Sequence, residues 1–407
     1  MESQLVLKKP SVGMSPLPGP RRFSLWKSFT VAVSLCLPFA AVLRAADDAH
    51  FNKKGNIVIA DQYNNRVIEI DPATHKIVWQ FGDGSSVPGP HSIVGTNDAE
   101  RFGSLTLISG TGIPALPAFT TPPTQSAIPV PLSGCPVAAQ QNGAGCPDNR
   151  VILVNQDGEI VWQYGQDAVA GSGPNQLNVP VAATVTPDGH FLITDQSNER
   201  VIEVDREKNI VWQYGVTGVS GITGVELNNP NSAELLANGD VLIADENNNR
   251  AIEVTHDLAN PNTLNIVATF TAGGTASGVA FASRLPNGDT LLTDSNNSRV
   301  VEVDKHDGLV WQFVTSALPG SVASPFLPLP TRAIQLSNGN VLISDQYNDQ
   351  VIEVTPSLPM GGAIVFTQGQ IGFAGDLFNR LNGPYDAKVI GDFTGLTPPP
   401  QHFELGD

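Results

Sequence analysis

The chain has 407 residues, of which 41% are hydrophobic and 15% are charged, with 39 glycines, 32 prolines and a formal net charge of −17. The hydrophobic fraction excludes general disorder, and the glycine and proline content is typical of a globular protein rich in turns. The negative charge disfavours nucleic acid as a partner, because phosphate backbones repel an acidic surface and the sequence shows no local basic patch.

The first 45 residues have the composition of a secretory signal. Basic residues at 8–27 precede an apolar run at 29–43, and Arg-Ala-Ala follows at 44–46. The apolar run is shorter than the roughly twenty residues that a membrane-spanning helix needs. We therefore predict a cleaved signal peptide at residues 1–45, no stable membrane span afterwards, and a secreted or periplasmic protein. Its removal leaves 16 basic and 38 acidic residues, a net charge of −22.

A phrase of sixteen residues, NIVIADQYNNRVIEID at 56–71, recurs along the chain. The copies have their aspartates at Asp61, Asp195, Asp245, Asp294 and Asp345. The steps between these aspartates are 134, 50, 49 and 51 residues, so the first step hides one more copy. That copy is SLTLISG, which ends at Gly110, 49 residues after Asp61. The sequence therefore contains six repeats with a period of about fifty residues.

Each repeat contains four short stretches of strand-forming residues separated by Gly, Asn and Asp. The last stretch carries the phrase VWQ or a variant of it, and most repeats begin with a proline followed by a strand. This pattern predicts an all-β, six-bladed β-propeller of four-stranded antiparallel blades at residues 46–397. The segment from Gly383 matches only the first strand of a repeat, so we expect N- and C-terminal strands to pair and close the ring. Residues 398–407 form a C-terminal tail.

The repeats resemble NHL repeats in having an Asp, then an Asn, then an Arg before a strand. Asp61, Asn64 and Arg66 show this order, and Gln350 replaces the Arg in the last copy. The resemblance implies a propeller, and NHL propellers include both binding modules and enzymes. The VWQ phrase resembles arylsulfotransferase and quinoprotein-type propellers more loosely.

Several repeated residues are expected to be architectural. The Asp should accept backbone N–H bonds across a turn while the Asn three positions on adopts a left-handed conformation; a ring of calcium sites would need more oxygen ligands than these two supply. Four tryptophans should fill the space between blades, and a series of glutamates should lie on a solvated face. These are Trp79, Trp162, Trp212 and Trp311, and Glu69, Glu203, Glu253, Glu302 and Glu353.

Residues 111–148 form an insertion between the second and third strands of the second repeat. Cys135 and Cys146 lie within it and are expected to form a disulfide in an oxidising compartment. Because this connection shares a rim with the start of the first strands, the insertion is interpreted as a lid over the channel or as surface decoration.

The residues that follow the leading proline differ from repeat to repeat. First strands line the channel of a propeller, so these residues should form its mouth. The polar ones are the candidate ligand-binding residues His91, Asn231, Arg332, Tyr385 and Asp386. Different polar groups converging on one place are typical of a binding site. Alternatively, Arg332 and Asp386 form a structural ion pair, with His91 and Asn231 bound to channel waters.

Two classes of function fit these candidates. The first is a binding module for a protein, peptide or glycan outside the cytoplasm, with no cofactor. The second is an enzyme at the channel mouth. The arylsulfotransferase resemblance implies His91 as nucleophile with Arg332 and Asn231 steadying the transferred group, whereas a lactone hydrolase would use Asp386, Asn231 and His91 to hold a divalent metal. An enzyme requires these side chains to converge on one enclosed volume.

Overall fold

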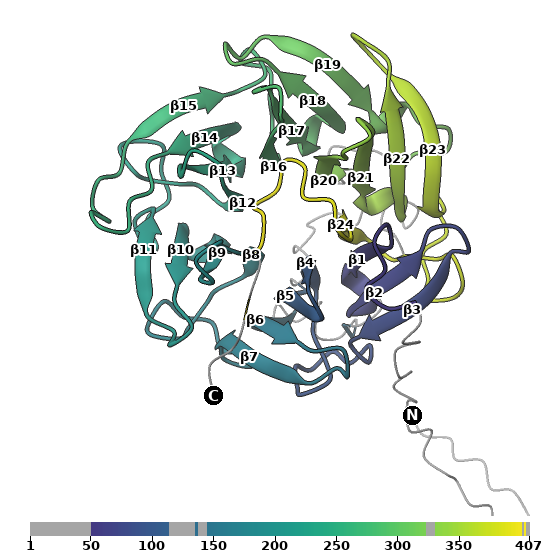
Figure 1. Cartoon of the computed structure of the whole chain (residues 1–407), viewed down its shortest axis with the longest axis horizontal. Helices are drawn as coiled ribbons and strands as arrows, with labels where there is room; N and C mark the ends of the chain where they lie inside the picture. The colour runs from purple at the N-terminus through teal and green to yellow at the C-terminus, as the bar shows by residue number, and fades with distance from the viewer. Residues whose placement is uncertain (1–49, 114–134, 137–144, 323–329, 401–402, 404–407) are drawn as a thin grey trace, which may run out of the picture. The chain divides into compact units, whose positions relative to one another are not determined.

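The computed structural model describes residues 50–113, 135–136, 145–322, 330–400 and 403. The predicted signal peptide and most of the insertion lie outside the described residues. The described chain forms six four-stranded antiparallel sheets, arranged as blades around a central axis (Figure 1), which confirms the predicted fold class. No helix in this part of the chain is long and apolar enough to cross a bilayer.

The blades follow one another in chain order, each running from the axis outward. Blade one contains β24 (Pro384–Val389), β1 (Ile57–Asp61), β2 (Arg66–Asp71) and β3 (Lys76–Phe81); blade two β4 (Thr96–Phe102), β5 (Leu105–Ile113), β6 (Cys146–Val154) and β7 (Ile160–Gly165); blade three β8 (Pro180–Val185), β9 (Phe191–Asp195), β10 (Arg200–Val204) and β11 (Ile210–Tyr214). Blade four contains β12 (Pro230–Leu235), β13 (Val241–Asp245), β14 (Arg250–Val254) and β15 (Ile266–Phe270); blade five β16 (Val279–Arg284), β17 (Thr290–Asp294), β18 (Arg299–Val303) and β19 (Leu309–Val314); blade six β20 (Pro330–Gln335), β21 (Val341–Asp345), β22 (Gln350–Pro356) and β23 (Gly362–Gly369).

The ring closes through blade one, as predicted. The C-terminal strand β24 pairs antiparallel with the N-terminal strand β1, with Ile57 opposite Val389 and Ile59 opposite Ala387. This pairing joins strands from the two ends of the described chain in one sheet, with β24 as its innermost strand. The predicted closure is therefore confirmed.

A buried carboxylate organises the turn between the second and third strands of a blade. In blade three, Asp195 Oδ2 accepts hydrogen bonds from Asn198 Nδ2 (2.7 Å) and Arg200 Nε (2.8 Å), and Oδ1 accepts one from the backbone N–H of Asn178 (2.8 Å). The same set of bonds recurs at Asp61 and in blades four and five. The left-handed residue is the one after the Asn, such as Glu199, so the prediction that the Asn itself takes this conformation is wrong.

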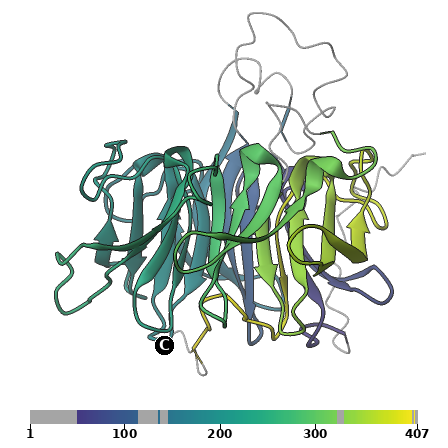
Figure 2. The ribbon, with the colours of Figure 1, turned by 90° about the horizontal axis from the view of Figure 1, so that it is seen from above.

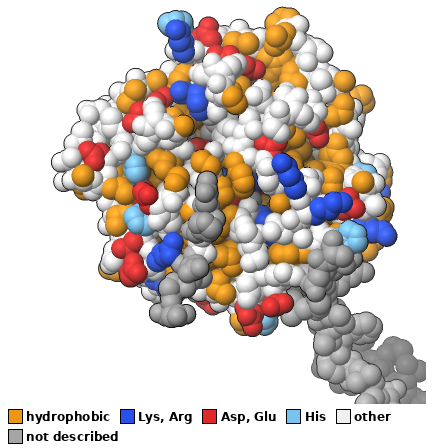
Figure 3. Space-filling view, in the orientation of Figure 1, with side chains coloured by type: hydrophobic (Ala, Val, Ile, Leu, Met, Phe, Trp, Pro, Cys, Tyr) orange, Lys and Arg blue, Asp and Glu red, His pale blue; other side chains and the backbone are white. Residues whose placement is uncertain are grey.

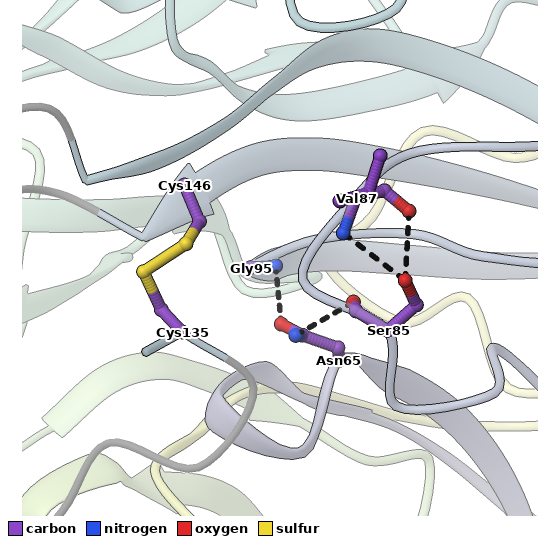
Figure 4. The surroundings of a disulfide bond; sticks show 6 residues. All are labelled: Asn65, Ser85, Val87, Gly95, Cys135 and Cys146. Atoms are coloured by element: carbon purple, nitrogen blue, oxygen red, sulfur yellow. Dashed lines mark hydrogen bonds between the residues drawn. A yellow bond between two sulfur atoms is a disulfide. The ribbon is translucent and has the colours of Figure 1, made fainter. Parts of the chain in front are cut away.

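In five of the blades this left-handed residue links the blade to the next one. Asn65 Oδ1 accepts a hydrogen bond from the backbone N–H of Gly95, 2.9 Å away, which lies just before β4 (Figure 4). Equivalent bonds of 2.5–3.0 Å join Asn149 to Val179, Glu199 to Asn229, Asn249 to Gly278 and Asp349 to Gly383. The donating N–H belongs to the residue directly before a first strand. These bonds therefore fix where that first strand begins.

Blade two builds the same turn with a residue from the far side of the insertion. Gly110 stands where the repeats have their Asp, and the carboxylate comes instead from Asp148 on β6. Asp148 Oδ2 accepts the backbone N–H of Val94 (2.6 Å), and Oδ1 accepts Arg150 Nε (2.5 Å). A Cβ at position 110 would lie 2.7 Å from the Asp148 carboxyl carbon, so the glycine makes room for the replacement carboxylate.

The tryptophans fill the spaces between blades as predicted. Trp79, Trp212 and Trp311 are at most 2% exposed, and Trp162 is 8% exposed. The prediction that the repeated glutamates lie on a solvated face is wrong for three of them. Glu69, Glu203 and Glu253 are buried. They receive basic partners from neighbouring strands or blades, for example Arg101 Nη1 at 2.8 Å from Glu69, which the repeat alone does not reveal.

The C-terminal residues cross one face of the ring at the axis (Figures 1 and 2). Thr397 anchors this crossing, because its backbone N–H and its Oγ1 both donate to Glu234 Oε2, at 2.7 and 2.6 Å. Leu396 packs in the apolar cluster of blades one, five and six. In the space-filling view of this face, apolar side chains lie around its centre (Figure 3). The segment that contains Leu396 and Thr397 therefore helps to close the channel at this end.

Buried carboxyl groups lie in the channel above the crossing. Burial raises the pKa of Glu100 to about 8, although the Lys388 ammonium group opposes the shift. Burial likewise raises the pKa of Glu234 to about 6 against the opposing hydrogen bonds from Thr397. Ionisation of these carboxyl groups therefore costs more in the folded chain than in the unfolded one.

We expect Asp148→Ala to lower the free energy of unfolding by about 3 kcal/mol, because it removes the buried carboxylate of Arg150 and leaves only the exposed Asp167, 3.4 Å away. Asp195→Ala should have a similar effect. Urea unfolding followed by fluorescence measures both, with the exposed Asp188→Ala as control. A loss below about 0.5 kcal/mol for Asp148→Ala, the range of ordinary surface substitutions, would contradict the structural role of this carboxylate.

We expect Glu100→Gln to stabilise the protein at high pH and not at low pH. The wild-type carboxyl ionises near 4.5 when unfolded and near 8 when folded, so it lowers stability progressively as the pH rises between these values. The melting temperature of the variant should match wild type near pH 4.5 and exceed it by several degrees above pH 8. The exposed Glu207→Gln is the control, and an equal gain at both pH values would contradict the assignment.

Candidate functional site

A cavity of about 630 Å³ opens at the end of the channel opposite to the tail crossing. It lies where β5 and β6 extend toward the insertion, and Thr111, Ile113 and Pro147 contribute to its wall. Amide and hydroxyl side chains make up most of the remaining lining, and Glu246 is the single carboxylate among the described lining residues. The cavity therefore has many hydrogen-bonding side chains in its wall and is almost uncharged.

Two rings of side chains build the cavity. The first is the bulged residue near the start of each first strand, where the pairing register shifts by one: Asn97, Val181, Asn231, Ala280, Thr331 and Tyr385. A bulge turns its side chain out of the strand's regular alternation, here toward the mouth. The second ring is the residue that follows the repeat carboxylate, or Gly110 in blade two: Gln62, Thr111, Gln196, Glu246, Ser295 and Gln346. All members of both rings except Val181 line the cavity.

Blades one, two and six form an amide and phenol wall. Gln62 Nε2 donates to Asn97 Oδ1 (2.6 Å), and Gln346 Nε2 donates to Gln62 Oε1 (2.5 Å). The hydroxyls of Tyr63 and Tyr347 lie 3.0 Å apart. Each of these side chains is held by its neighbour, so this wall presents fixed donors, acceptors and ring surfaces.

Blade four supplies the carboxylate of the cavity. Glu246 Oε2 accepts hydrogen bonds from Asn231 Nδ2 (2.8 Å) and Asn229 Nδ2 (3.1 Å). Burial raises the pKa of Glu246, while these bonds and the more distant Arg332 oppose the shift. Asn231 also exchanges hydrogen bonds with the Tyr385 hydroxyl at 2.8 and 3.1 Å. The predicted residues Asn231 and Tyr385 thus meet within one network.

Arg332 closes the channel beneath the cavity. It is 1% exposed, and its guanidinium donates to backbone carbonyls of three other blades: Nη1 to Ala280 O (3.1 Å), and Nη2 to Val181 O and Asn231 O (3.3 Å each). The guanidinium carbon lies 5.0 Å from the ring centre of Phe281. Arg332 therefore joins the blades across the axis, bonded to the backbone of the cavity-lining residues Asn231 and Ala280, and is not itself part of the lining.

Asp386 points away from the cavity, into the channel below. Its Oδ2 pairs with Lys388 Nζ at 2.9 Å and accepts the backbone N–H of Ala99 at 3.2 Å. Burial and the neighbouring Asp98 raise the pKa of Asp386 to about 6, although Lys388 opposes the shift. No ion pair joins it to Arg332 within the described chain, so the predicted structural pair is not formed. Arg332 and Asp386 both directly follow a bulged residue, and Asp386 takes as its cation Lys388, two residues further along the same strand.

His91 lies outside the cavity, which corrects its predicted place at the mouth. The first strand of blade two begins at Thr96, so the residues equivalent to the predicted pairs are Asn97 and Asp98. The Gly-Pro pair before His91 belongs to the preceding loop, and its resemblance to the leading prolines misplaced the start of the strand. His91 is exposed and borders a separate surface hollow beside Arg150.

The five candidate residues therefore do not converge on one volume. Asn231 and Tyr385 line the cavity, whereas Arg332, Asp386 and His91 do not. The metal ligands proposed for a lactone hydrolase, Asp386, Asn231 and His91, are not assembled, and no group of three His, Cys, Asp or Glu residues in the described chain is arranged to hold a metal ion. The second ring was missed, although its residues stand beside the repeat carboxylate and differ between repeats.

The predicted disulfide between Cys135 and Cys146 is present, with an S–S distance of 2.10 Å (Figure 4). Both cysteines are buried in an apolar cluster with Ile113 and Tyr63, which line the cavity. The disulfide therefore ties part of the insertion to the cavity wall. The rest of the insertion, and with it the choice between lid and decoration, lies outside the described residues.

Comparison with solved structures finds proteins whose sequences have low identity to this chain. A protein of unknown function from Bacteroides caccae is 13% identical, with a TM-score of 0.49, over 77% of this chain and 93% of that chain. The periplasmic gluconolactonase of Pseudomonas aeruginosa is 12% identical (TM-score 0.46; 82% and 98% covered), and virginiamycin B lyase from Staphylococcus aureus is 12% identical (TM-score 0.40; 66% and 68% covered). These likenesses are too distant to inform on activity.

Comparison with curated protein sequences finds no match. A family model does match, over residues 117–354, and its description is outer membrane protein assembly factor BamB. The matched segment spans more than half of the chain. The protein therefore belongs to the β-propeller family described as outer membrane protein assembly factor BamB.

Proposed function

We propose that this protein is an exported, NHL-like β-propeller that binds an uncharged polar ligand, a glycan or a peptide, in the cavity at its channel mouth. The observation that carries the proposal is the pair of side-chain rings that line this cavity. The first ring has Asn in two blades and Val, Ala, Thr and Tyr in the others, and the second has Gln in three blades and Thr, Glu and Ser in the others. The amide and hydroxyl groups of the two rings converge on one volume.

The chemistry of the lining selects the ligand class. Amides such as Gln62 and Gln196 both donate and accept hydrogen bonds, and they match the hydroxyls of a sugar or the amides of a peptide backbone. Among the described lining residues no Lys or Arg is present to attract an anion, and Glu246 disfavours one. A neutral ligand rich in hydrogen-bonding groups therefore fits better than a phosphate or a carboxylate.

A binding role also fits the compartment. The disulfide between Cys135 and Cys146 suits an oxidising environment, and the N-terminal sequence predicts export. The family description refers to assembly at the outer membrane. The enzyme hypotheses lose their main support because His91, the proposed nucleophile, is separated from Arg332 and Asn231.

Ser197→Trp tests the site, because Ser197 is exposed and lines the cavity. We expect the mature wild-type protein to retain specific members of a neutral glycan or peptide array, and the variant to bind them at least tenfold more weakly because the indole fills the mouth. Fluorescence titration with the retained compound measures the change.

Asn247→Trp is the matched control. Asn247 has the same place in η3 (Glu246–Asn248) as Ser197 has in η2 (Gln196–Asn198) and is exposed, but it does not line the cavity. Equal binding by wild type and Ser197→Trp would place the ligand elsewhere and contradict the proposal. Equal loss of ligand binding in both variants would also contradict the proposal.

A further inference from the structure

Three loops of the ring share one backbone design. They join a fourth strand to the next first strand at residues 166–179, 216–229 and 370–383. In each, a glycine N–H donates to a leucine carbonyl six residues later, at 2.9–3.0 Å, and a repeat Asn donates its side-chain N–H to that glycine's carbonyl, at 2.7–2.8 Å. The bonded glycines are Gly171, Gly221 and Gly375. The three loops are therefore internal controls for one another.

The third loop carries bulky apolar residues where the other two have small or polar ones. Positions 377 and 378 are Leu and Phe, whereas the equivalent pairs are Gly173-Pro174 and Thr223-Gly224. Leu377 is 75% exposed and Phe378 is 68% exposed. Because two loops of the same design fold without them, these side chains are not needed for the local structure. Exposed apolar groups without a structural role mark an interaction surface.

A hollow of about 510 Å³ lies between this loop and blade one. Leu377 and Phe378 contribute to its apolar side, as do Ile68 and Ile77. Lys76 and Arg380 contribute basic groups to the same lining, and Asp376 contributes one carboxylate. Neither basic residue forms an ion pair with the described chain. The position equivalent to Arg380 is Gln176 in one of the other loops and Glu226 in the other, so the basic charge is again specific to this loop.

We propose that this hollow and loop dock the protein onto an anionic phospholipid surface. The headgroup phosphate would lie against Lys76 and Arg380, and the side chains of Leu377 and Phe378 would enter the upper acyl region. Arg380 Nη1 donates to Gln370 Oε1 at 2.6 Å and its guanidinium lies over the Phe373 ring, so its charge is held in place without an ion-pair partner. The order of groups in the site, cations without ion pairs beside exposed apolar tips, matches the order of phosphate and acyl chain in a phospholipid. A protein partner offers no such fixed order, so the membrane surface is the better-matched occupant.

The strong negative net charge of the protein does not prevent docking of this loop onto an anionic surface. At physiological ionic strength charges are screened over about 8 Å, so the basic groups beside the loop dominate the potential that a headgroup meets there. The loop also leads into β24, whose first residues line the cavity. The hollow borders β3 and β23, the outermost strands of blades one and six, so docking through it would hold the ring by its outer side.

Co-sedimentation of the mature protein with vesicles tests the proposal. We expect binding to phosphatidylcholine vesicles that contain phosphatidylglycerol, weaker binding to phosphatidylcholine alone, and a decrease with added salt. Leu377→Gly/Phe378→Pro, which copies the loop at 166–179, should lower the bound fraction about tenfold through the lost apolar contact. Lys76→Gln/Arg380→Gln should remove the preference for phosphatidylglycerol.

Ile222→Ser is the matched control, because Ile222 is 56% exposed on an equivalent loop without adjacent basic residues. It should leave vesicle binding unchanged, and equal melting temperatures should show that every variant is folded. Absence of vesicle binding, or binding that Leu377→Gly/Phe378→Pro leaves intact, would overturn the proposal. Competition by inorganic phosphate without dependence on Leu377 and Phe378 would overturn it in favour of a soluble anion. Loss of a copurifying protein in that variant, without vesicle binding, would assign the patch to a protein partner instead.

Discussion

The architecture depends on one buried carboxylate per blade. In blade three, Asp195 binds the side chains of its own turn through Oδ2 and the backbone that leads into β8 through Oδ1. Gln196, the residue after Asp195, faces the cavity. Asn178, whose backbone N–H binds Asp195 just before β8, lines the same cavity. The same carboxylate thus positions both rings of the mouth. A desolvated carboxylate is stable in this place because an arginine, an amide and a backbone N–H compensate its burial together.

In a frame of this kind, the residues that specify the fold are different from the residues that line the binding cavity. Strand registers, turns and blade contacts are specified by repeated residues, so the two ring positions are free to differ without loss of the fold. Tyr385 and Gln346 on one side, and Glu246 on another, give the mouth an asymmetric lining on a nearly symmetric scaffold. Arg332 binds backbone carbonyl groups of three other blades across the axis and so ties together the strands that carry the first ring.

Repetition made most of the fold predictable from the sequence. The period gave six blades, the partial repeat at the C-terminus gave the closure, and the spacing of Trp79 and its counterparts gave the packing between blades. Prediction failed where one blade departs from the pattern. A Gly-Pro pair before His91 imitates a strand entry that begins at Thr96, and Asp148 supplies from beyond the insertion a carboxylate that the repeat places at position 110. Partners contributed by a neighbouring blade, such as Arg101 for Glu69, leave no signal within a single repeat.

The most direct test of a binding site at the mouth is ligand protection of a cysteine placed in it. In a Ser197→Cys variant the new thiol would stand at the cavity, and in an Asn247→Cys variant at the equivalent turn outside it. The rate of maleimide labelling is measured with and without a compound that the protein retains. The account predicts that the compound slows labelling at position 197 and leaves position 247 unchanged. Equal rates at position 197 with and without the compound would contradict it.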